Sequence, residues 1–420
     1  MYIPRHLHHM LTKLIAQFPA VMVTGARQVG KSTLLQHTAR EQEERYDYVT
    51  FDDPIRLEQA QDDPMLFMMN HSGRLVLDEV QYAPKLFSVL KLHIDEKKQN
   101  GLFLLSGSQA FSLMEHVNES LAGRVAVLRL LGLSYREIRG VEFFEGFVPT
   151  EAYLKAYEFA IDRQEQTTDD KSSPDTLWQM IHKGQMPRLY EQETHWEVYY
   201  ASYVSTYLQR DVRHIANIRD LNDFTRFMTA VAARSGELLN YNNIAQEVGV
   251  SVDTIKRWIA ILEISGIVYL LKPYHHNHLK RAIKTPKIYM LDTGLMAYLT
   301  KWLTPEVLQH GAKNGQFFES FVVAEILKSF YNQGAEPPVY FYRDTNQKEI
   351  DIIIEQDGII YPVEIKMTAK PTKKHATHFN TLKEQLPADE IGIGTGVIIN
   401  QYPNKLWLDK ELVALPVGYL

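Results

Sequence analysis

The chain has 420 residues, of which 45% are apolar and 23% are charged, as in a globular protein of roughly two to four domains. Its 45 basic and 51 acidic residues give a net charge of −6, which excludes a chain that is basic throughout but allows a local basic surface for nucleic acid. Cysteine is absent, so disulfides, thiol catalysis and zinc–thiolate sites are excluded. The sequence shows neither a signal peptide nor an apolar run of about 18 residues, and we therefore expect a cytoplasmic protein without a membrane span.

Four regions follow one another along the chain. In residues 1–140, short apolar runs such as AVMVT and RLVLD alternate with helical stretches, a pattern typical of a buried parallel sheet. Residues 141–175 contain the polar stretch DRQEQTTDDKSSPD and are predicted to be a loop or linker. Helical periodicity dominates residues 176–286, and an α/β pattern returns in residues 287–420, where KIYMLD is the first expected strand. We therefore predict an α/β fold class, with a helical middle between two α/β domains.

A glycine-rich motif, GARQVGKST, lies between the first apolar run and a helical stretch. Its spacing matches G-x-x-x-x-G-K-[ST], in which backbone N–H groups curl around phosphates at a helix N-terminus. We expect the ammonium group of Lys31 to reach the β- and γ-phosphates and the hydroxyl group of Ser32 to bind Mg²⁺. The predicted nucleotide-binding residues of this loop are Gly25, Ala26, Arg27, Gln28, Val29, Gly30, Lys31, Ser32 and Thr33. A chance glycine-rich turn is the alternative, but the flanking strand and helix argue against it.

The next expected strands end in residues that suit the same nucleotide site. RLVLDE ends in Asp78 and Glu79, which we predict to hold Mg²⁺ and to polarise the attacking water, respectively. LFLLSGSQ ends near Ser106 and Ser108, either of which is a candidate contact for the γ-phosphate, although a plain strand-to-turn transition has the same pattern. Arg124 is a candidate arginine finger that acts on the nucleotide of a neighbouring subunit, and a surface ion pair is the alternative.

Several segments together resemble a family of bacterial and archaeal AAA-type ATPases whose C-terminal region has no known function. The segments are GARQVGKSTLL, YVTFDDP, LVLDEVQYAP, LLSGSQ, SLAGRV and KTPKIYMLDTGL, and the resemblance covers essentially the whole chain. It implies binding of ATP with Mg²⁺ and hydrolysis of ATP. It also implies homo-oligomers in which an arginine reaches a neighbour's nucleotide.

The middle region contains helix-turn-helix spacing in YNNIAQEVGVSVDTIKRW. Ala245 lets the two helices approach, Gly249 sits at the turn, and Ser251 suits the N-cap of the second helix. The basic segment from Lys272 to Lys287 has the turn residues of a wing and could contact phosphates. The alternative is a winged helix that serves only as a structural lid or interaction module. The histidines in this segment, His275, His276 and His278, fit a solvated loop better than a metal site.

The C-terminal region resembles the PD-(D/E)XK nuclease core. Asp351 lies near the start of one expected strand, and Glu364 and Lys366 lie two residues apart on the next, so that they face the same side. The resemblance implies that Asp351 and Glu364 are metal ligands, that Glu319 on the preceding helix is a weaker third ligand, and that Lys366 positions or activates water. A degenerate fold that binds without cutting, or a charged hairpin with a Glu–Lys ion pair, remains open. Candidate phosphate contacts are Lys370, Lys373, Lys374, His375 and His378.

Two classes of function fit these motifs. The first is an ATP-driven enzyme that acts on nucleic acid, with DNA favoured over RNA, and that carries a metal-dependent nuclease site. The second is a nucleotide-controlled switch whose C-terminal domain recognises a partner without cleaving it. A protein remodeller is a third alternative.

Overall fold

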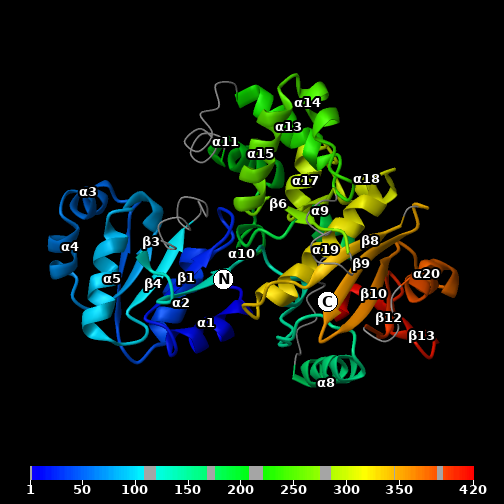
Figure 1. Ribbon diagram of the computed structural model, residues 1–420, viewed down its shortest axis with the longest axis horizontal. Helices are drawn as coiled ribbons and strands as arrows, with labels where there is room; N and C mark the ends of the chain where they lie inside the picture. The colour runs from blue at the N-terminus through cyan, green and yellow to red at the C-terminus, as the bar shows by residue number, and fades with distance from the viewer. Residues whose placement is uncertain are drawn as a thin grey trace.

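The computed structural model describes residues 2–107, 120–167, 176–207, 221–274, 285–344, 346–385 and 391–420. Figure 1 shows an N-terminal α/β domain on one side, a C-terminal sheet on the other, and a group of helices above them. The predicted α/β fold class with a helical middle is therefore confirmed. Among the described helices, none is long and apolar enough to cross a membrane.

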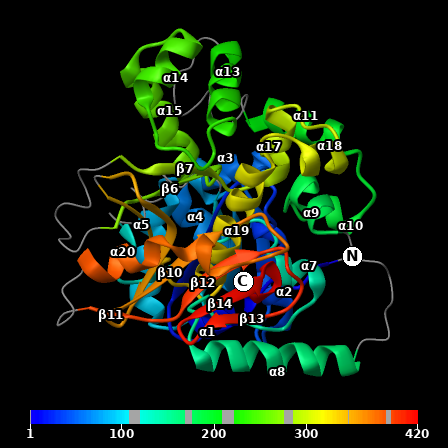
Figure 2. The same ribbon diagram turned by 90° about the vertical axis from the view of Figure 1, so that its right-hand side faces the viewer.

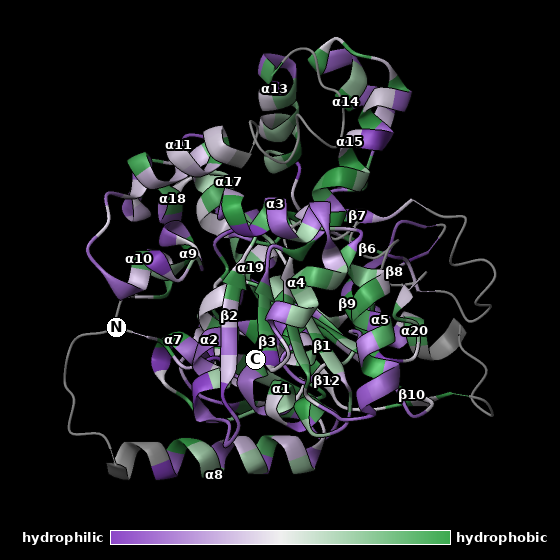
Figure 3. Cartoon of the chain, turned by 90° about the vertical axis from the view of Figure 1, so that its left-hand side faces the viewer, coloured by the Kyte–Doolittle hydropathy of each residue, from purple (hydrophilic) through white to green (hydrophobic). Residues whose placement is uncertain are grey.

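The N-terminal domain is built on a parallel sheet with the order β2-β3-β4-β1-β5. Its strands are β1 (Ala20–Thr24), β2 (Tyr46–Thr50), β3 (Arg74–Asp78), β4 (Phe103–Gly107) and β5 (Val125–Arg129). Its helices are α1 (Leu7–Ile15), α2 (Lys31–Glu41), α3 (Pro54–Asp62), α4 (Pro64–Asn70), α5 (Leu86–Lys97) and α7 (Tyr135–Arg139), with a short 3-10 turn at Val80–Tyr82. Alternate residues of β1 enter two different cores, because Val21 and Val23 pack on one face and Ala20 and Met22 on the other. Hydrophobic residues accordingly gather on these central strands (Figure 3).

A long helix, α8 (Glu151–Thr167), lies within residues 141–175, where we predicted a loop or linker, so that prediction is wrong for this part. Tyr153 and Tyr157 are buried on one face of α8, and both rings contact Phe143 edge to face at centroid distances of 5.3 and 5.4 Å. The prediction missed the helix because its many charged residues concealed an apolar face at i, i+4 spacing. In Figure 2, α8 lies along the end of the molecule opposite α14.

The middle region is helical, and a two-stranded antiparallel sheet lies between its helices α15 and α17. Its helices are α9 (Leu177–Lys183), α10 (Arg188–Glu191), α11 (Trp196–Tyr207), α13 (Leu221–Ala232), α14 (Tyr241–Val248), α15 (Val252–Ile264), α17 (Thr293–Leu299) and α18 (Pro305–His310). The strand β7 (Lys287–Met290), which we expected to begin the C-terminal domain, pairs instead with β6 (Val268–Leu271). The strand pattern of KIYMLD was recognised correctly, but its period of two does not identify the partner strand.

The C-terminal domain is a mixed sheet behind one long helix, α19 (Asn314–Tyr331). The strand order is β13-β14-β12-β10-β9-β8, and β11 also pairs with β10. The elements are β8 (Val339–Arg343), β9 (Glu349–Gln356), β10 (Ile359–Ile365), a 3-10 turn (Lys373–Ala376), α20 (His378–Gln385), β11 (Gly392–Ile393), β12 (Gly396–Asn400), β13 (Leu406–Asp409), β14 (Leu412–Pro416) and a final 3-10 turn (Val417–Tyr419). Asp357 and Gly358 connect β9 and β10 with φ angles of +53° and +74°, as a tight hairpin requires.

Helix α19 contacts both the N-terminal domain and the middle region. The ammonium group of Lys328 donates to the carbonyl oxygen of Leu133 at 2.8 Å, and Glu325 accepts a hydrogen bond from the backbone N–H of Tyr135 at 2.7 Å. Nearer its N-terminus, the hydroxyl group of Ser320 lies 2.7 Å from that of Ser235 in the middle region. Because these contacts are buried, α19 fixes the C-terminal sheet against both preceding regions.

Candidate nucleotide and metal sites

The glycine-rich loop turns between the end of β1 and the start of α2. Gly25 has φ of +147°, and a Cβ atom there would lie 2.1 Å from the carbonyl oxygen of Leu130, so only glycine fits. Gly30 is left-handed at the N-cap of α2, and no side chain caps the first turn. The ammonium group of Lys31 is buried and donates to the carbonyl oxygens of Gly25 and Ala26 at 2.9 and 2.8 Å. An uncapped helix N-terminus next to a buried ammonium group suits a polyphosphate.

The carboxylate of Asp78 lies at the centre of this site. Ser32 donates to its Oδ1 atom at 2.8 Å, and Tyr48 donates to its Oδ2 atom at 2.7 Å. Ser106 also donates to Oδ1. The contact arises because β3 and β4 are neighbouring parallel strands whose carboxyl ends meet beside the start of α2. A hydroxyl group next to a carboxylate is the donor set that Mg²⁺ takes in nucleotide sites, so these residues fit that ion.

The remaining predicted residues of the site lie in different places. Glu79 follows Asp78 in a left-handed conformation with φ of +56°, and its carboxylate accepts a hydrogen bond from Gln81. Arg124 precedes β5 and lies at the amino ends of the parallel strands, whereas the loop follows the carboxyl end of β1; it forms a surface ion pair with Asp95 at 2.7 Å. This is the contact that we gave as the alternative to an arginine finger. Ser108 lies outside the described residues.

A cavity of about 340 Å³ opens beside Lys31 and Glu79. The middle region forms part of its wall through α10, which contributes Arg188 and Glu191. Arg188 and Tyr48 were not predicted from the sequence, because Arg188 reaches the cavity and Tyr48 reaches Asp78 only through the packing of segments that lie apart in the chain. Residues 186–191, MPRLYE, carry no spacing signal that could have identified Arg188.

In the C-terminal domain, Asp351 on β9 and Glu364 on β10 lie together with Lys366. The Lys366 Nζ atom is 3.3 Å from Asp351 Oδ2 and 3.0 Å from Glu364 Oε2. The backbone N–H of Ile365 donates to Asp351 Oδ2 at 2.8 Å. The two carboxyl groups therefore share the ammonium group of Lys366 as a common partner.

Burial and mutual repulsion separate the pKa values of these two carboxyl groups. Burial, together with the charge of Asp351, raises the pKa of Glu364 to about 9. Burial acts in the same direction on Asp351, but the hydrogen bond from Glu364 and the charges of Lys366 and Lys287 hold its pKa below the ordinary value. At neutral pH the pair therefore holds one proton. A buried carboxyl pair that shares a proton can exchange it for a divalent cation, so the donor set fits a metal ion.

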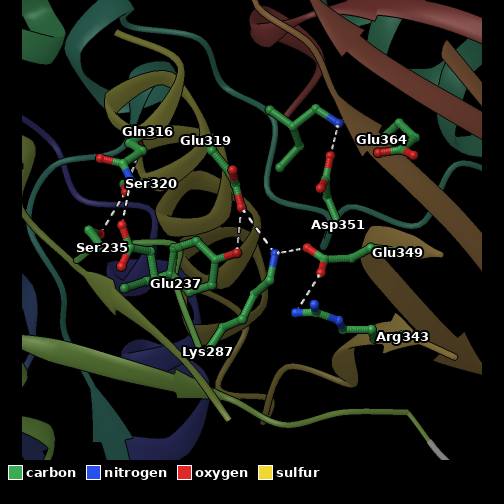
Figure 4. A network of polar contacts seen from close by, with 12 residues as sticks. Ser235, Glu237, Lys287, Gln316, Glu319, Ser320, Arg343, Glu349, Asp351 and Glu364 are labelled. Atoms are coloured by element: carbon green, nitrogen blue, oxygen red, sulfur yellow. Dashed lines mark hydrogen bonds and ion pairs between the residues drawn. The ribbon is translucent and has the colours of Figure 1, made fainter. Parts of the chain in front are cut away.

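Glu319 belongs to a different set of contacts, which Figure 4 shows beside Asp351 and Glu364. Its Oε1 atom accepts a hydrogen bond from the hydroxyl group of Tyr289 at 2.6 Å and lies 3.5 Å from the Nζ atom of Lys287. The same Nζ atom lies 2.5 Å from Glu349 Oε1, and the other oxygen of Glu349 lies 3.5 Å from Arg343. Sequence analysis missed Lys287 and Glu349 as neighbours of the predicted metal site.

The three predicted C-terminal ligands therefore do not converge as one trio. Across the described part of the chain, one group of three His, Asp or Glu residues has its ligand atoms all within 4.8 Å, and that group is His8, His37 and Glu41 on α1 and α2. The structure brings Asp351 and Glu364 together with Lys366, and it places Glu319 with Lys287.

The helix-turn-helix residues lie on α14 and α15, with Gly249 left-handed at φ of +83° between them. Ser251 caps α15 by accepting a hydrogen bond from the backbone N–H of Thr254 at 3.1 Å. Lys256 and Arg257 are exposed, while Trp258 is buried. The histidines at 275, 276 and 278 lie outside the described residues.

The basic stretch after Lys366 is partly engaged in contacts within the chain. Lys373 forms an ion pair with Asp409 at 2.6 Å, and the Nδ1 atom of His378 lies 2.9 Å from the carbonyl oxygen of Glu349. Lys370 and Lys374 are exposed, and His375 caps its own 3-10 turn through the backbone N–H of Thr372.

Comparison with protein families divides the chain into three matched segments. Residues 17–139 match an AAA domain, residues 174–306 match a domain of unknown function (DUF8612), and residues 314–420 match another (DUF4143). Uncharacterized proteins of Mycobacterium bovis and Mycobacterium tuberculosis are each 29% identical over 371 residues, which cover 86% of this chain and 73% of theirs.

Solved structures with partial similarity include a Walker-type ATPase and a RuvB mutant. A Walker-type ATPase of Pyrococcus abyssi is 12% identical, with a TM-score of 0.38 over 71% of this chain and 96% of that chain. A RuvB mutant of Thermotoga maritima is 16% identical, with a TM-score of 0.31 over 63% of this chain and 88% of that chain. These TM-scores are too low to indicate a shared arrangement of the whole chains.

Proposed function

Because this chain carries an AAA-type P-loop ATPase domain, we propose that it binds ATP with Mg²⁺ and hydrolyses ATP. The observation that carries the proposal is the hydrogen bond between Ser32 and Asp78, because it joins the hydroxyl group after the loop lysine to the carboxylate at the end of β3. Bound Mg²⁺ would neutralise charge on the β- and γ-phosphates. Ser32 and Asp78 are the residues that would hold it.

Each protein group has a defined task in this proposal. Lys31 would exchange the two carbonyl oxygens of its own loop for phosphate oxygens. Glu79 would accept a proton from the attacking water, and its left-handed backbone directs it into the same cavity as Lys31. Arg188 would contact the phosphates from the opposite wall.

The test is phosphate release by purified protein with ATP and Mg²⁺. We expect Lys31→Ala to lose ATP binding and Glu79→Gln to lose about 10²–10⁴-fold in turnover while it still binds ATP, as for removal of a general base. Glu96→Gln, at an exposed acid on α5, serves as the matched control and should turn over at the wild-type rate. Wild-type turnover in Glu79→Gln would refute the assignment.

Homo-oligomer formation is part of the proposal, and it determines the role of Arg124. Since Arg124 lies at the amino ends of the parallel strands and Lys31 follows the carboxyl end of β1, Arg124 can contribute to hydrolysis only from a second copy of the chain. Sedimentation with and without ATP would measure the assembly. Arg124→Ala should lower turnover only under conditions where oligomers form.

We further propose that the chain acts on nucleic acid, with DNA favoured over RNA, through a winged helix formed by α13–α15 and the β6–β7 pair. The exposed Lys256 and Arg257 on α15 support this role. DNA should then stimulate ATP turnover, and Lys256→Ala/Arg257→Ala should reduce that stimulation. Stimulation that is unchanged in this double variant would contradict the role of α15.

For the C-terminal domain we propose a metal-dependent nuclease-like site at Asp351, Glu364 and Lys366. The supporting observation is that the Lys366 ammonium group contacts both carboxyl groups. Labelled single-stranded, double-stranded and branched DNAs with Mg²⁺ or Mn²⁺, with and without ATP, test for cleavage. Products that disappear in Lys366→Ala would support a nuclease. Intact DNA together with active ATPase would favour the second candidate, a nucleotide-controlled switch whose C-terminal domain binds a partner without cutting.

A further inference from the structure

Lys287 is a buried lysine that the middle region contributes to the acidic cluster of the C-terminal domain. It is the first residue of β7, and its side chain is only 5% exposed. Its Nζ atom lies between Glu319 and Glu349, at 3.5 and 2.5 Å from their Oε1 atoms (Figure 4). Two residues further along β7, Tyr289 donates to the same oxygen of Glu319 at 2.6 Å. One strand therefore supplies two donors to the helix carboxylate.

The positive charges in this cluster nearly balance its negative charges. Its acids are Glu319, Glu349, Asp351 and Glu364, and its cations are Lys287, Arg343 and Lys366. The positive charge of Lys287 also acts on Asp351. Clustered carboxylates attract divalent ions through their negative charge, and nearby Lys and Arg side chains weaken that attraction by neutralising part of the charge. Here the four carboxyl groups exceed the three cations by one formal negative charge.

Two divalent ions in one site typically lie about 3.5–4 Å apart and share carboxylates between them. A second ion beside an ion at Asp351 and Glu364 would need Glu319 as a ligand. The Oε1 atom of Glu319 already lies 3.5 Å from the ammonium group of Lys287 and accepts a hydrogen bond from Tyr289, so a second ion there would have to compete with that positive charge. The described ligand atoms of Glu319, Asp351 and Glu364 also do not lie within 4.8 Å of one another as a trio.

We propose that the ammonium group of Lys287 occupies the second cation position of this cluster, so that the site takes a single divalent cation at Asp351 and Glu364. Glu319 is then the anchor of Lys287, not a metal ligand. This inference rests on the proposed metal site at Asp351 and Glu364.

The backbone around Lys287 keeps the ammonium group in place. Residues 287–290 pair with residues 268–271 along the whole of β6, and Leu238 forms a further bridge to Lys287. This pairing fixes the backbone of Lys287, and because its side chain is only 5% exposed, the ammonium group has little room to turn out of the cluster. A metal ion at this position could not simply displace a flexible surface side chain.

The experiment counts Mn²⁺ ions by titration against the electron paramagnetic resonance signal of free Mn²⁺. The full chain is used without nucleotide and with Asp78→Asn, which weakens the nucleotide-site ligand set. For each protein, the number of Mn²⁺ ions that remain bound after Asp351→Asn is subtracted from the number bound before it. Binding elsewhere, including at His8 and His37, is thereby removed from the count. We expect one such ion in this parent protein and two in Lys287→Met. One ion in Lys287→Met, with an affinity within threefold of the parent, would overturn the inference.

A second variant removes the dependence on how well Lys287→Met folds. Glu319→Gln keeps Lys287 in contact with Glu349, and we expect it to bind one ion with an affinity within threefold of the parent. A tenfold or greater loss would identify Glu319 as a ligand and overturn the inference. The combined variant Lys287→Met/Glu319→Gln should return to one ion. If Asp351→Asn removes no Mn²⁺ from the parent protein, the proposed metal site itself fails, which is a different result from an unchanged count in Lys287→Met.

Discussion

Replacement of the buried Arg5 should make the glycine-rich loop, residues 25–33, open more often. The guanidinium group of Arg5 donates to the carbonyl oxygen of Val29 in the loop at 2.7 Å and to that of Leu131 at 2.8 Å, and its Nε atom lies 3.2 Å from Glu137 Oε1. Arg5→Met leaves Glu137 buried without its cation. Breaking a buried ion pair in this way costs about 3–5 kcal/mol. Since about 1.4 kcal/mol is a factor of ten, we expect amide hydrogens of residues 25–33 that exchange by local opening to exchange about 10²- to 4 × 10³-fold faster.

The pH dependence has a defined sign. Burial acts to raise the pKa of Glu137, but the charges of Arg5 and His6 and two backbone N–H groups hold that pKa below its ordinary value. The stabilisation is therefore fully present above the unfolded-state pKa of about 4.3 and is lost as the pH falls through the folded-state pKa. The difference between wild type and Arg5→Met should therefore begin to shrink only as the pH falls below about 4.3 toward the folded-state pKa.

Hydrogen exchange followed by mass spectrometry of peptides across residues 25–33 makes the measurement. Arg40→Met, at an exposed arginine in the last turn of α2, is the matched control and should exchange like the wild type. Exchange of the loop in Arg5→Met within threefold of the wild-type rate would refute the reasoning.

Three further predictions concern other contacts. Arg188→Ala should weaken ATP binding about tenfold through loss of one charged hydrogen bond, and an unchanged affinity in a fluorescent-nucleotide titration would remove Arg188 from the site. Gly25→Ala should abolish the thermal stabilisation that ATP gives, because the new Cβ atom would meet a backbone oxygen at 2.1 Å, whereas Gly73→Ala, with nothing within 4 Å, should keep it. Glu325→Gln should leave the buried Lys328 without the ion-pair partner that lies 2.7 Å away, at a cost of about 3–5 kcal/mol in folding free energy. Thermal unfolding monitored by circular dichroism should then show a lower midpoint. A midpoint within 1 °C of wild type would contradict this.

The parts of the fold that sequence reasoning reached are those with local signals. The loop at 25–33 has fixed spacing between a strand and a helix, and the contact of Asp78 with Ser32 follows from the meeting of parallel strand ends. The pairing of Asp351 with Glu364 likewise follows from a hairpin with a tight Asp-Gly turn.

The parts that it missed depend on how distant segments dock. Arg188 reaches the nucleotide cavity, and Lys287 reaches Glu319, only because α10 and β7 pack against domains far from them in sequence. The strand period of KIYMLD identified a strand but gave no information on whether it pairs with β6 or with the C-terminal sheet. Helix α8 was missed because residues of high helix propensity were judged by their polarity.

The position of Lys287 also determines how this chain can be divided or recombined. A fragment that begins at residue 314, where the last family match starts, would keep Asp351, Glu364 and Lys366 but lose Lys287 and Tyr289. Its exposed Glu319 would then recruit ions from the buffer, and any metal requirement measured on it would belong to the fragment alone. For the same reason, a chimaera between two relatives would have to exchange the C-terminal sheet together with β6 and β7. The segments that must stay together therefore differ from the segments that the family matches separate.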